Sequence, residues 1–421
     1  MTQSFEDMIY LFSCGAKGIM PSIGHEININ EIYKYAKDQG VWQTVFVSLK
    51  KLCNDGELEL DLDNFTAFKN QVLYMVASNA KRTLKIRSLI QAFEQSQIKY
   101  CILKGEVLAQ LYHNPGLRSS GDTDILIDKA DKKAALRALK SCGFDIEPQN
   151  ATSHHIRATH PVAGLVELHL SLYDELFEDV WFDNKALNKE EYIRIKTDDG
   201  GEIQTLGITD GLIFVALHCT KHFLSKGVGI KHLMDILLYC EHYRNEIDWD
   251  RFNNLMKHLK FKKFIDNIFG IGVNYLNFNS ESLPDHTCDA GIMSKILSDI
   301  ERGGAFGKNE SERKGFYLEY TKMRFKQFKS GDYNSYIKRW WAPNIIKALF
   351  PHIKDLAEKY PCLKKYPFLY PIMWINRVLR LIISFIKKEK SINTYLNLGK
   401  TPAESPIVKQ RLDLIHELDM M

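Results

Sequence analysis

The chain has 421 residues, 45% of them hydrophobic and 26% charged, which is the composition of an ordinary globular protein with two or three structural units. The formal net charge of +4 gives no support for a long nucleic acid or an anionic membrane as the main partner. The first residues lack the basic and apolar regions of an export signal, and the eight cysteines form no Cys-x-x-Cys pair. We therefore expect a cytoplasmic protein with neither a zinc ribbon nor a disulfide framework.

Residues 1–95 are predicted to form an N-terminal helical region, because apolar residues recur there every three or four positions. The period then changes, and strands are predicted at residues 98–103, 124–128 and 164–172. Helices are expected between these strands, and the second of them should end at Gly143. The polar connection before the third strand is expected to be a surface loop rather than a set of ligands; its histidines are His154, His155 and His160.

The order strand, helix, strand, helix, strand predicts a small core of mixed helix and strand over residues 96–206. From residue 207 the pattern is helical again, so we expect a helical domain at residues 207–301 and a C-terminal helical region at residues 302–421. The Gly-rich, charged stretch 302–313 is the expected linker or flexible loop. Residues 378–388 have the pattern of an amphipathic helix, for which a buried face and peripheral contact with a membrane are the two interpretations.

Two aspartates one residue apart, Asp122 and Asp124, stand at the start of the second strand. Residues i and i+2 of a strand face the same side, so the two carboxylates should point together while Thr123 points away. Two carboxylates this close repel and are costly to bury, and a bound divalent cation removes that cost. Mg²⁺ is usually held by one or two carboxylates together with substrate phosphates. The pair therefore suggests a metal–nucleotide site, with a solvated pair at a strand end as the alternative.

Four more residues can complete such a site. Glu167, on the polar side of the third strand, adds a carboxylate if that strand neighbours the second, and three carboxylates can hold two ions. Lys104 and Gly105 lie between a strand and a helix start, where backbone N–H groups and the ammonium can bind phosphate. Arg118 is a second candidate phosphate ligand. Ordinary solvated surface charges are the alternative for Lys104 and Arg118.

The segments "LKGEVLAQLYHNPGLRSSGDTDILI", "ALRALKSCGF" and "VELHL" follow one another in this chain. This succession resembles the bacterial family of uncharacterised nucleotidyltransferases, within the DNA polymerase beta-like nucleotidyltransferase superfamily. The resemblance covers about residues 95 to 380 and continues in "ALHCTKHFLSKGVGIKHLMDI". The fold that it implies is α+β, a small mixed-sheet nucleotidyltransferase core flanked by N-terminal and C-terminal helical regions.

By this resemblance the catalytic residues, which are also the ligands of Mg²⁺ or Mn²⁺, are Asp122, Asp124 and Glu167. Glu167 is in addition a candidate base for the acceptor hydroxyl. The resemblance implies that the phosphates of the nucleotide contact Lys104, Gly105 and Arg118. The helical domain at residues 207–301 would form the substrate side of the site. The substrate-side candidates are His169, His218, His222, Lys231 and Asp235, with a structural polar network as the alternative.

The function expected from these residues is a metal-dependent transfer of NMP from an NTP, with ATP as the expected donor, to a hydroxyl or phosphate group. The acceptor is unknown; a sugar or small metabolite is favoured over a long nucleic acid, which would need a more basic chain. One alternative is a glycosyltransferase that holds a nucleotide-sugar through Asp-x-Asp. A second is a catalytically inactive nucleotide-binding or scaffold protein, which the Lys104-Gly105 loop favours because the superfamily usually has Gly-Ser there.

Overall fold

The computed structural model describes residues 1–56, 58, 62–147, 155–172, 192–225, 227–307, 363, 366–375 and 406–420. The chain divides into two compact units, one of residues 1–321 with 414–421 and one of residues 322–413. The predicted domain boundaries after residues 95, 206 and 301 all fall inside the first unit and stay predictions. The proposed amphipathic helix at 378–388 and residues 308–313 of the Gly-rich stretch lie outside the described residues.

The first unit begins with three short helices and one long one. They are α1 (Gln3–Lys17), α2 (Ile29–Gln39), α3 (Trp42–Asn54) and α4 (Leu62–Gln95). Side-chain oxygens of Thr2 and Asn28 cap the first two helices, and glycines with left-handed φ values of 74° and 68°, Gly18 and Gly40, end them. The predicted N-terminal helical region is therefore present. Within the described chain, every helix is too short or too polar to cross a bilayer.

A mixed five-stranded sheet follows, with the strand order β1–β2–β5–β4–β3. Its strands are β1 (Tyr100–Ile102), β2 (Asp122–Ile127), β3 (Asp145–Ile146), β4 (His155–His160) and β5 (Gly164–His169). β2 and β5 are parallel, and the other neighbours are antiparallel. Between the strands lie α5 (Gly105–Ala109), η1 (Pro115–Leu117), η2 (Lys129–Asp131) and α6 (Lys132–Ser141). Gly143 follows α6 with φ 80°, the left-handed conformation expected at this helix end.

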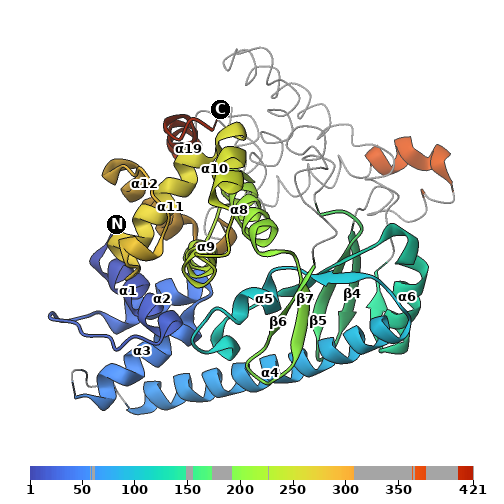
Figure 1. The fold of residues 1–421 in the computed structure, drawn as a ribbon, viewed down its shortest axis with the longest axis horizontal. Coiled ribbons are helices and arrows are strands. Elements are labelled where there is room, and N and C mark those ends of the chain that lie inside the picture. The colour runs from blue at the N-terminus through green and yellow to red at the C-terminus, as the bar shows by residue number, and fades with distance from the viewer. Residues whose placement is uncertain are drawn as a thin grey trace. The chain divides into compact units, whose positions relative to one another are not determined.

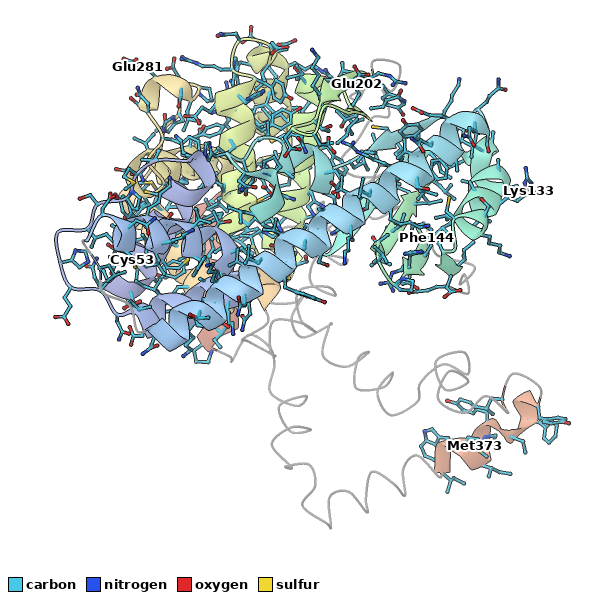
Figure 2. The ribbon with its side chains drawn as sticks, turned by 90° about the horizontal axis from the view of Figure 1, so that it is seen from below. Cys53, Lys133, Phe144, Glu202, Glu281 and Met373 are labelled. Atoms are coloured by element: carbon cyan, nitrogen blue, oxygen red, sulfur yellow. The ribbon has the colours of Figure 1, made fainter. Side chains whose placement is uncertain are left out.

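One face of the sheet is the hydrophobic core of this region. Ile125 and Val166 of the two parallel strands are fully buried there, together with Leu89 of α4 and Leu139 of α6. Helix α4 covers this face: Figure 2 shows it running from the side of Cys53 toward α6, which carries Lys133. Because strand side chains alternate, the residues at 122, 124, 167 and 169 belong to the opposite face.

Strand β4 corrects the prediction for the polar connection, whose residues 155–160 were expected to form a surface loop. In "HIRATH" only Ile156 and Ala158 are apolar, and both are fully buried between β5 and β3. Two small apolar residues among polar neighbours gave too weak an alternation to be recognised. His160 accepts hydrogen bonds through Nδ1 from the backbone of Val162 and Ala163, so it stabilises the turn to β5. His154 lies outside the described residues.

A hairpin that the sequence did not reveal joins the sheet to the later helices. It consists of β6 (Ile193–Lys196) and β7 (Glu202–Thr205). Gln204 and Thr205 donate side-chain hydrogen bonds to backbone carbonyls of β1 at 2.6 and 2.8 Å, so the hairpin is attached to the free edge of that strand. The core is thus an α+β fold with mixed strand directions.

The remaining described elements are almost all helical, as predicted. They are α8 (Ile208–Ser225), α9 (Ile230–His242), α10 (Trp249–His258), α11 (Lys262–Tyr275), η3 (Ser280–Ser282), α12 (Ala290–Gly303), η4 (Ala305–Gly307), η5 (Pro367–Leu369) and α19 (Pro406–Glu417). Figure 1 shows α1 to α3 beside α9, α11 and α12, with α8 and α9 turned toward the sheet. Lys17 of α1 pairs with Glu241 of α9 at 3.0 Å, which ties the first helices to the later ones.

Candidate active site

The parallel pairing of β2 with β5 brings the predicted carboxylates together. Asp124 lies opposite Glu167 in the register, and Asp122 lies opposite Leu165. Thr123 points to the other face, where its hydroxyl contacts Arg82 of α4. The expected neighbour relation of these two strands, and the shared face of the aspartates, are therefore both present.

Asp124 is the buried centre of this group, with an exposed fraction of 2%. His169 donates from Nε2 to its Oδ1 at 2.6 Å, and the Lys104 ammonium lies 2.9 Å from its Oδ2. Burial alone would raise the pKa of the Asp124 carboxyl, but His169 and Lys104 hold it below its usual range. The residue is therefore a carboxylate at neutral pH.

Potential ligand atoms of three residues, Asp124, Glu167 and His169, all lie within 4.8 Å of one another. Two carboxylates and an imidazole are suitable donors for a divalent cation. Glu167 is more exposed than Asp124 and forms an ion pair with Arg157 of β4 at 3.2 Å. Asp122 is half-buried at the mouth of the same group. The predicted metal ligands thus share one location, and His169, two residues after Glu167 on the same strand face, lies with them.

Lys104 reaches Asp124 from an unusual backbone conformation. Its φ of 37° lies in the left-handed region, which residues other than glycine rarely adopt. Gly105 follows as the first residue of α5, and a Cβ there would lie 3.0 Å from Ser120 Oγ and 3.4 Å from the Asp122 carbonyl. The glycine therefore allows the loop after β1 to approach the start of β2 closely.

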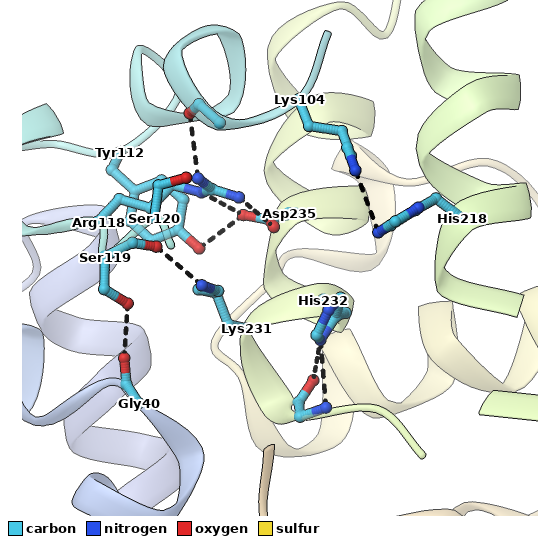
Figure 3. A network of polar contacts seen from close by, with 12 residues as sticks. Gly40, Lys104, Tyr112, Arg118, Ser119, Ser120, His218, Lys231, His232 and Asp235 are labelled. Atoms are coloured by element: carbon cyan, nitrogen blue, oxygen red, sulfur yellow. Dashed lines mark hydrogen bonds and ion pairs between the residues drawn. The ribbon is translucent and has the colours of Figure 1, made fainter. Parts of the chain in front are cut away.

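Arg118 and Asp235, predicted on opposite sides of the site, are bound to each other. The guanidinium donates to both carboxylate oxygens, from Nε at 2.9 Å and from Nη2 at 2.7 Å (Figure 3). A third donor is the Tyr112 hydroxyl, 2.9 Å from Asp235 Oδ1, and Arg118 Nη1 also donates to the Gly105 carbonyl at 3.0 Å. Both charged groups are more than nine-tenths buried. The roles predicted for them in binding remain predictions.

The residues after Arg118 are held by other elements in turn. Lys231 of α9 donates to the Ser119 carbonyl at 2.8 Å, and Ser119 Oγ donates to the Gly40 carbonyl at 2.8 Å (Figure 3). The Ser120 carbonyl accepts from Arg82 of α4 at 2.6 Å. The short loop that leads into β2 is thus fixed from several directions.

Helix α8 presents the predicted histidines to the site. His218 Nε2 lies 3.5 Å from the Lys104 ammonium and 2.9 Å from His222 Nε2. An ammonium can only donate, so His218 Nε2 is the acceptor in its contact with Lys104. Burial, followed by the charge of Lys104, holds the pKa of His218 well below its usual range, which agrees with a neutral ring.

One cavity of about 420 Å³ connects all these groups. The predicted residues that line it are Lys104, Gly105, Arg118, Asp122, Asp124, Glu167, His169, His218, His222, Lys231 and Asp235. Every site residue selected from the sequence therefore faces the same space, with the sheet on one side and α8 and α9 on the other.

Two residues that line the cavity were not predicted from the sequence. His232 stands beside Lys231 and packs edge-on against Phe306, with ring centroids 5.0 Å apart. His232 continues the face of α9 that carries Asp235, so helical spacing could have identified it. Phe306 comes from the Gly-rich stretch expected to be a linker, and nothing local in the sequence indicated that it reaches the cavity.

Residues 25–277 match the model of a protein family described as uncharacterised nucleotidyltransferase. No curated protein matches the chain significantly. Among solved structures, the antibiotic-resistance factor ANT(2'')-Ia is similar, with 9% identity, a TM-score of 0.32, and coverage of 43% of this chain and 92% of that chain.

Two further solved structures are similar to parts of the chain. The lincosamide antibiotic adenylyltransferase LnuA, bound to lincomycin, has 16% identity and a TM-score of 0.27, with 37% of this chain and 94% of that chain covered. An antigenic nucleotidyltransferase-like protein from Paracoccidioides brasiliensis has 16% identity and a TM-score of 0.28, with 42% and 86% covered.

Proposed function

The chain belongs to the family of uncharacterised nucleotidyltransferases, and from this premise we propose that it transfers NMP from an NTP, with ATP as the expected donor, to a hydroxyl or phosphate group of an acceptor. In this reaction the acceptor oxygen forms a bond to the α-phosphorus while the bond from that phosphorus to the β-phosphate oxygen breaks, and pyrophosphate leaves. The proposal is for a metal-dependent reaction with Mg²⁺ or Mn²⁺.

The observation that carries this proposal is the ionised, buried Asp124 with Glu167 and His169 around it, next to Asp122. Carboxylate oxygens suit Mg²⁺, and an imidazole with carboxylates also suits Mn²⁺, so the donor set fits a divalent ion. Such an ion would stabilise charge on the transferred phosphate and on the leaving pyrophosphate. Asp122, Asp124 and Glu167 are the proposed ligands, with His169 orienting Asp124 or joining them.

The remaining groups would bind and orient the substrates. Lys104 is placed to exchange its contact with Asp124 for one with a phosphate oxygen, since both partners are anionic. Glu167, whose carboxylate is partly exposed to the cavity, is the proposed base that takes the proton of the acceptor hydroxyl. Arg118, held by its ion pair with Asp235, would form part of the cavity wall.

The acceptor is proposed to bind against α8 and α9. The imidazoles of His218 and His222 line the cavity there, and Lys231 adds a positive charge. A space of about 420 Å³ is at the lower end of the range for small-molecule pockets, which supports a sugar or small metabolite as acceptor. One of the similar structures is described as a lincosamide antibiotic adenylyltransferase, so antibiotics are one class to include in a screen.

The test is pyrophosphate release from each of the four NTPs with Mg²⁺ or Mn²⁺, using a cell extract as the source of acceptor. The variants are Asp122→Asn and Asp124→Asn, and the control is Asp145→Asn, which removes an exposed carboxylate from the same sheet. Release by the wild type and the control but by neither site variant supports the proposal, and labelled NTP then identifies the acceptor. Nucleotide binding without release would favour the inactive nucleotide-binding alternative, and hydrolysis of a UDP-sugar would favour the glycosyltransferase.

A further inference from the structure

A buried arginine on the opposite face of the sheet reaches the start of β2. Arg82 lies on α4, and its side chain is more than nine-tenths buried. Its guanidinium donates from Nη1 to the Ser120 carbonyl at 2.6 Å. Nη2 donates to the Asp122 carbonyl and, at 2.7 Å, to the Thr123 hydroxyl.

These acceptors surround the first aspartate of the pair. Ser120 and Asp122 carry the carbonyls on either side of Gly121, and Thr123 separates the two aspartates. Ser120 Oγ donates to the Asp122 carbonyl as well, at 2.8 Å. One planar group therefore fixes the orientation of the peptides that place the Asp122 side chain on the cavity face.

Burying this guanidinium is costly, and the cost is incompletely offset. Its Nε is buried without a hydrogen-bond partner among the described residues. An arginine with an unsatisfied donor is a poor choice for stability alone, because a buried charge needs all its partners. Only a guanidinium can bind two carbonyls and a hydroxyl with a rigid fork, which lysine lacks.

We propose that Arg82 is a positioning residue for the metal ligands: it holds the entrance of β2 so that Asp122 joins Asp124 and Glu167. The inference rests on the proposed function, because it concerns the same ions. Arg82 lies on the opposite face of the sheet, and its hydrogen bonds described above go to backbone carbonyls and the Thr123 hydroxyl rather than to the carboxylates of the cavity. Removing outer partners of metal ligands typically weakens metal affinity by roughly 10- to 100-fold.

The test measures Mn²⁺ affinity of the full chain without nucleotide, by the electron paramagnetic resonance signal of free Mn²⁺. Arg82→Lys keeps the charge and loses the fork. Arg87→Lys is the matched control, since Arg87 lies on the same helix and donates to Thr197 and Asp199 of the β6–β7 turn instead. Thermal unfolding of each variant confirms that it is folded.

We expect Arg82→Lys to bind Mn²⁺ roughly 10-fold more weakly or worse, and Arg87→Lys to bind like the wild type. If Arg82→Lys does not fold, Thr123→Val, which removes one acceptor of the guanidinium, should still weaken binding. Unchanged Mn²⁺ affinity in folded Arg82→Lys overturns the inference. If Arg82→Lys does not fold, unchanged affinity in Thr123→Val overturns it instead. An equal loss of affinity in Arg87→Lys also overturns it. A wild type that binds no Mn²⁺ either alone or with a non-hydrolysable NTP analogue instead overturns the metal-dependent function itself, so the two failures are distinguishable.

Discussion

Replacing Asp235 by alanine should be one of the most damaging single changes in the first unit. Its carboxylate accepts from Arg118 Nε and Nη2 at 2.9 and 2.7 Å and from the Tyr112 hydroxyl at 2.9 Å. Arg118 and Tyr112 are both more than nine-tenths buried, so they lose an acceptor in a place with little contact to bulk solvent. In the variant the guanidinium would keep the Gly105 carbonyl as a hydrogen-bond acceptor but would have no carboxylate partner among the contacts described above.

The size of the effect follows from these contacts. Removing one partner of a buried ion pair costs about 3–5 kcal/mol, because the other charge stays buried without compensation. The unpaired Tyr112 hydroxyl alone accounts for about 1–3 kcal/mol, and the two contributions overlap. We therefore expect Asp235→Ala to lower the free energy of unfolding by about 3–5 kcal/mol. Arg118→Met/Asp235→Leu, which removes both charges, should be less damaging than Asp235→Ala.

Urea denaturation followed by circular dichroism measures these differences, with Asp250→Ala as an exposed control. A loss below about 1 kcal/mol, the range of surface ion pairs, would refute the reasoning for Asp235→Ala. So would a double variant that is no more stable than the single one, because the penalty would then not come from an uncompensated charge.

Two further predictions concern other parts of the same unit. Gly15→Ala would place a Cβ 2.3 Å from the backbone carbonyl of Thr44, so α1 and α3 must separate. We expect the free energy of unfolding to fall by about 1–3 kcal/mol. Gly24→Ala, with open space around it, should be neutral, and thermal melts compare the two variants. Burial lowers the pKa of His232 to about 4 in the folded chain, against about 6.5 when unfolded. Between these two pH values the unfolded state binds the extra proton. The free energy of unfolding should therefore fall by up to about 3 kcal/mol as the pH drops from 6.5 to 4. Melts across this range should show a smaller fall for His232→Gln, and an equal fall would disprove the assignment.

The sequence predicted the strand part of the site well because the relevant period is local. Asp122 and Asp124 share a face for the same reason that Glu167 and His169 do, and only the pairing of their two strands had to be assumed. Strand β4 escaped prediction because its buried alternation consists of Ile156 and one alanine. Tertiary pairing between β5 and β3, rather than local propensity, makes that segment a strand.

The partners of the charged residues could not be predicted in this way. Arg118 and Asp235 are 117 positions apart, and each was a plausible ligand residue when considered alone. Arg82 is 38 positions from Ser120 and has no motif around it. Such contacts depend on how helices pack against the loop, which periodicity does not specify.

The two aspartates that first indicated the site have different physical roles in the fold. Asp124 can be buried as a carboxylate because Lys104 and His169 compensate its charge, so it is fixed before any ion or substrate arrives. Asp122 is half-buried, and Arg82 binds its backbone carbonyl rather than its carboxylate. If both are metal ligands, as proposed, one is rigid, and the side chain of the other can still adjust on a fixed main chain. Under the proposed function, this combination would suit a site in which coordination changes as the nucleotide binds and pyrophosphate leaves.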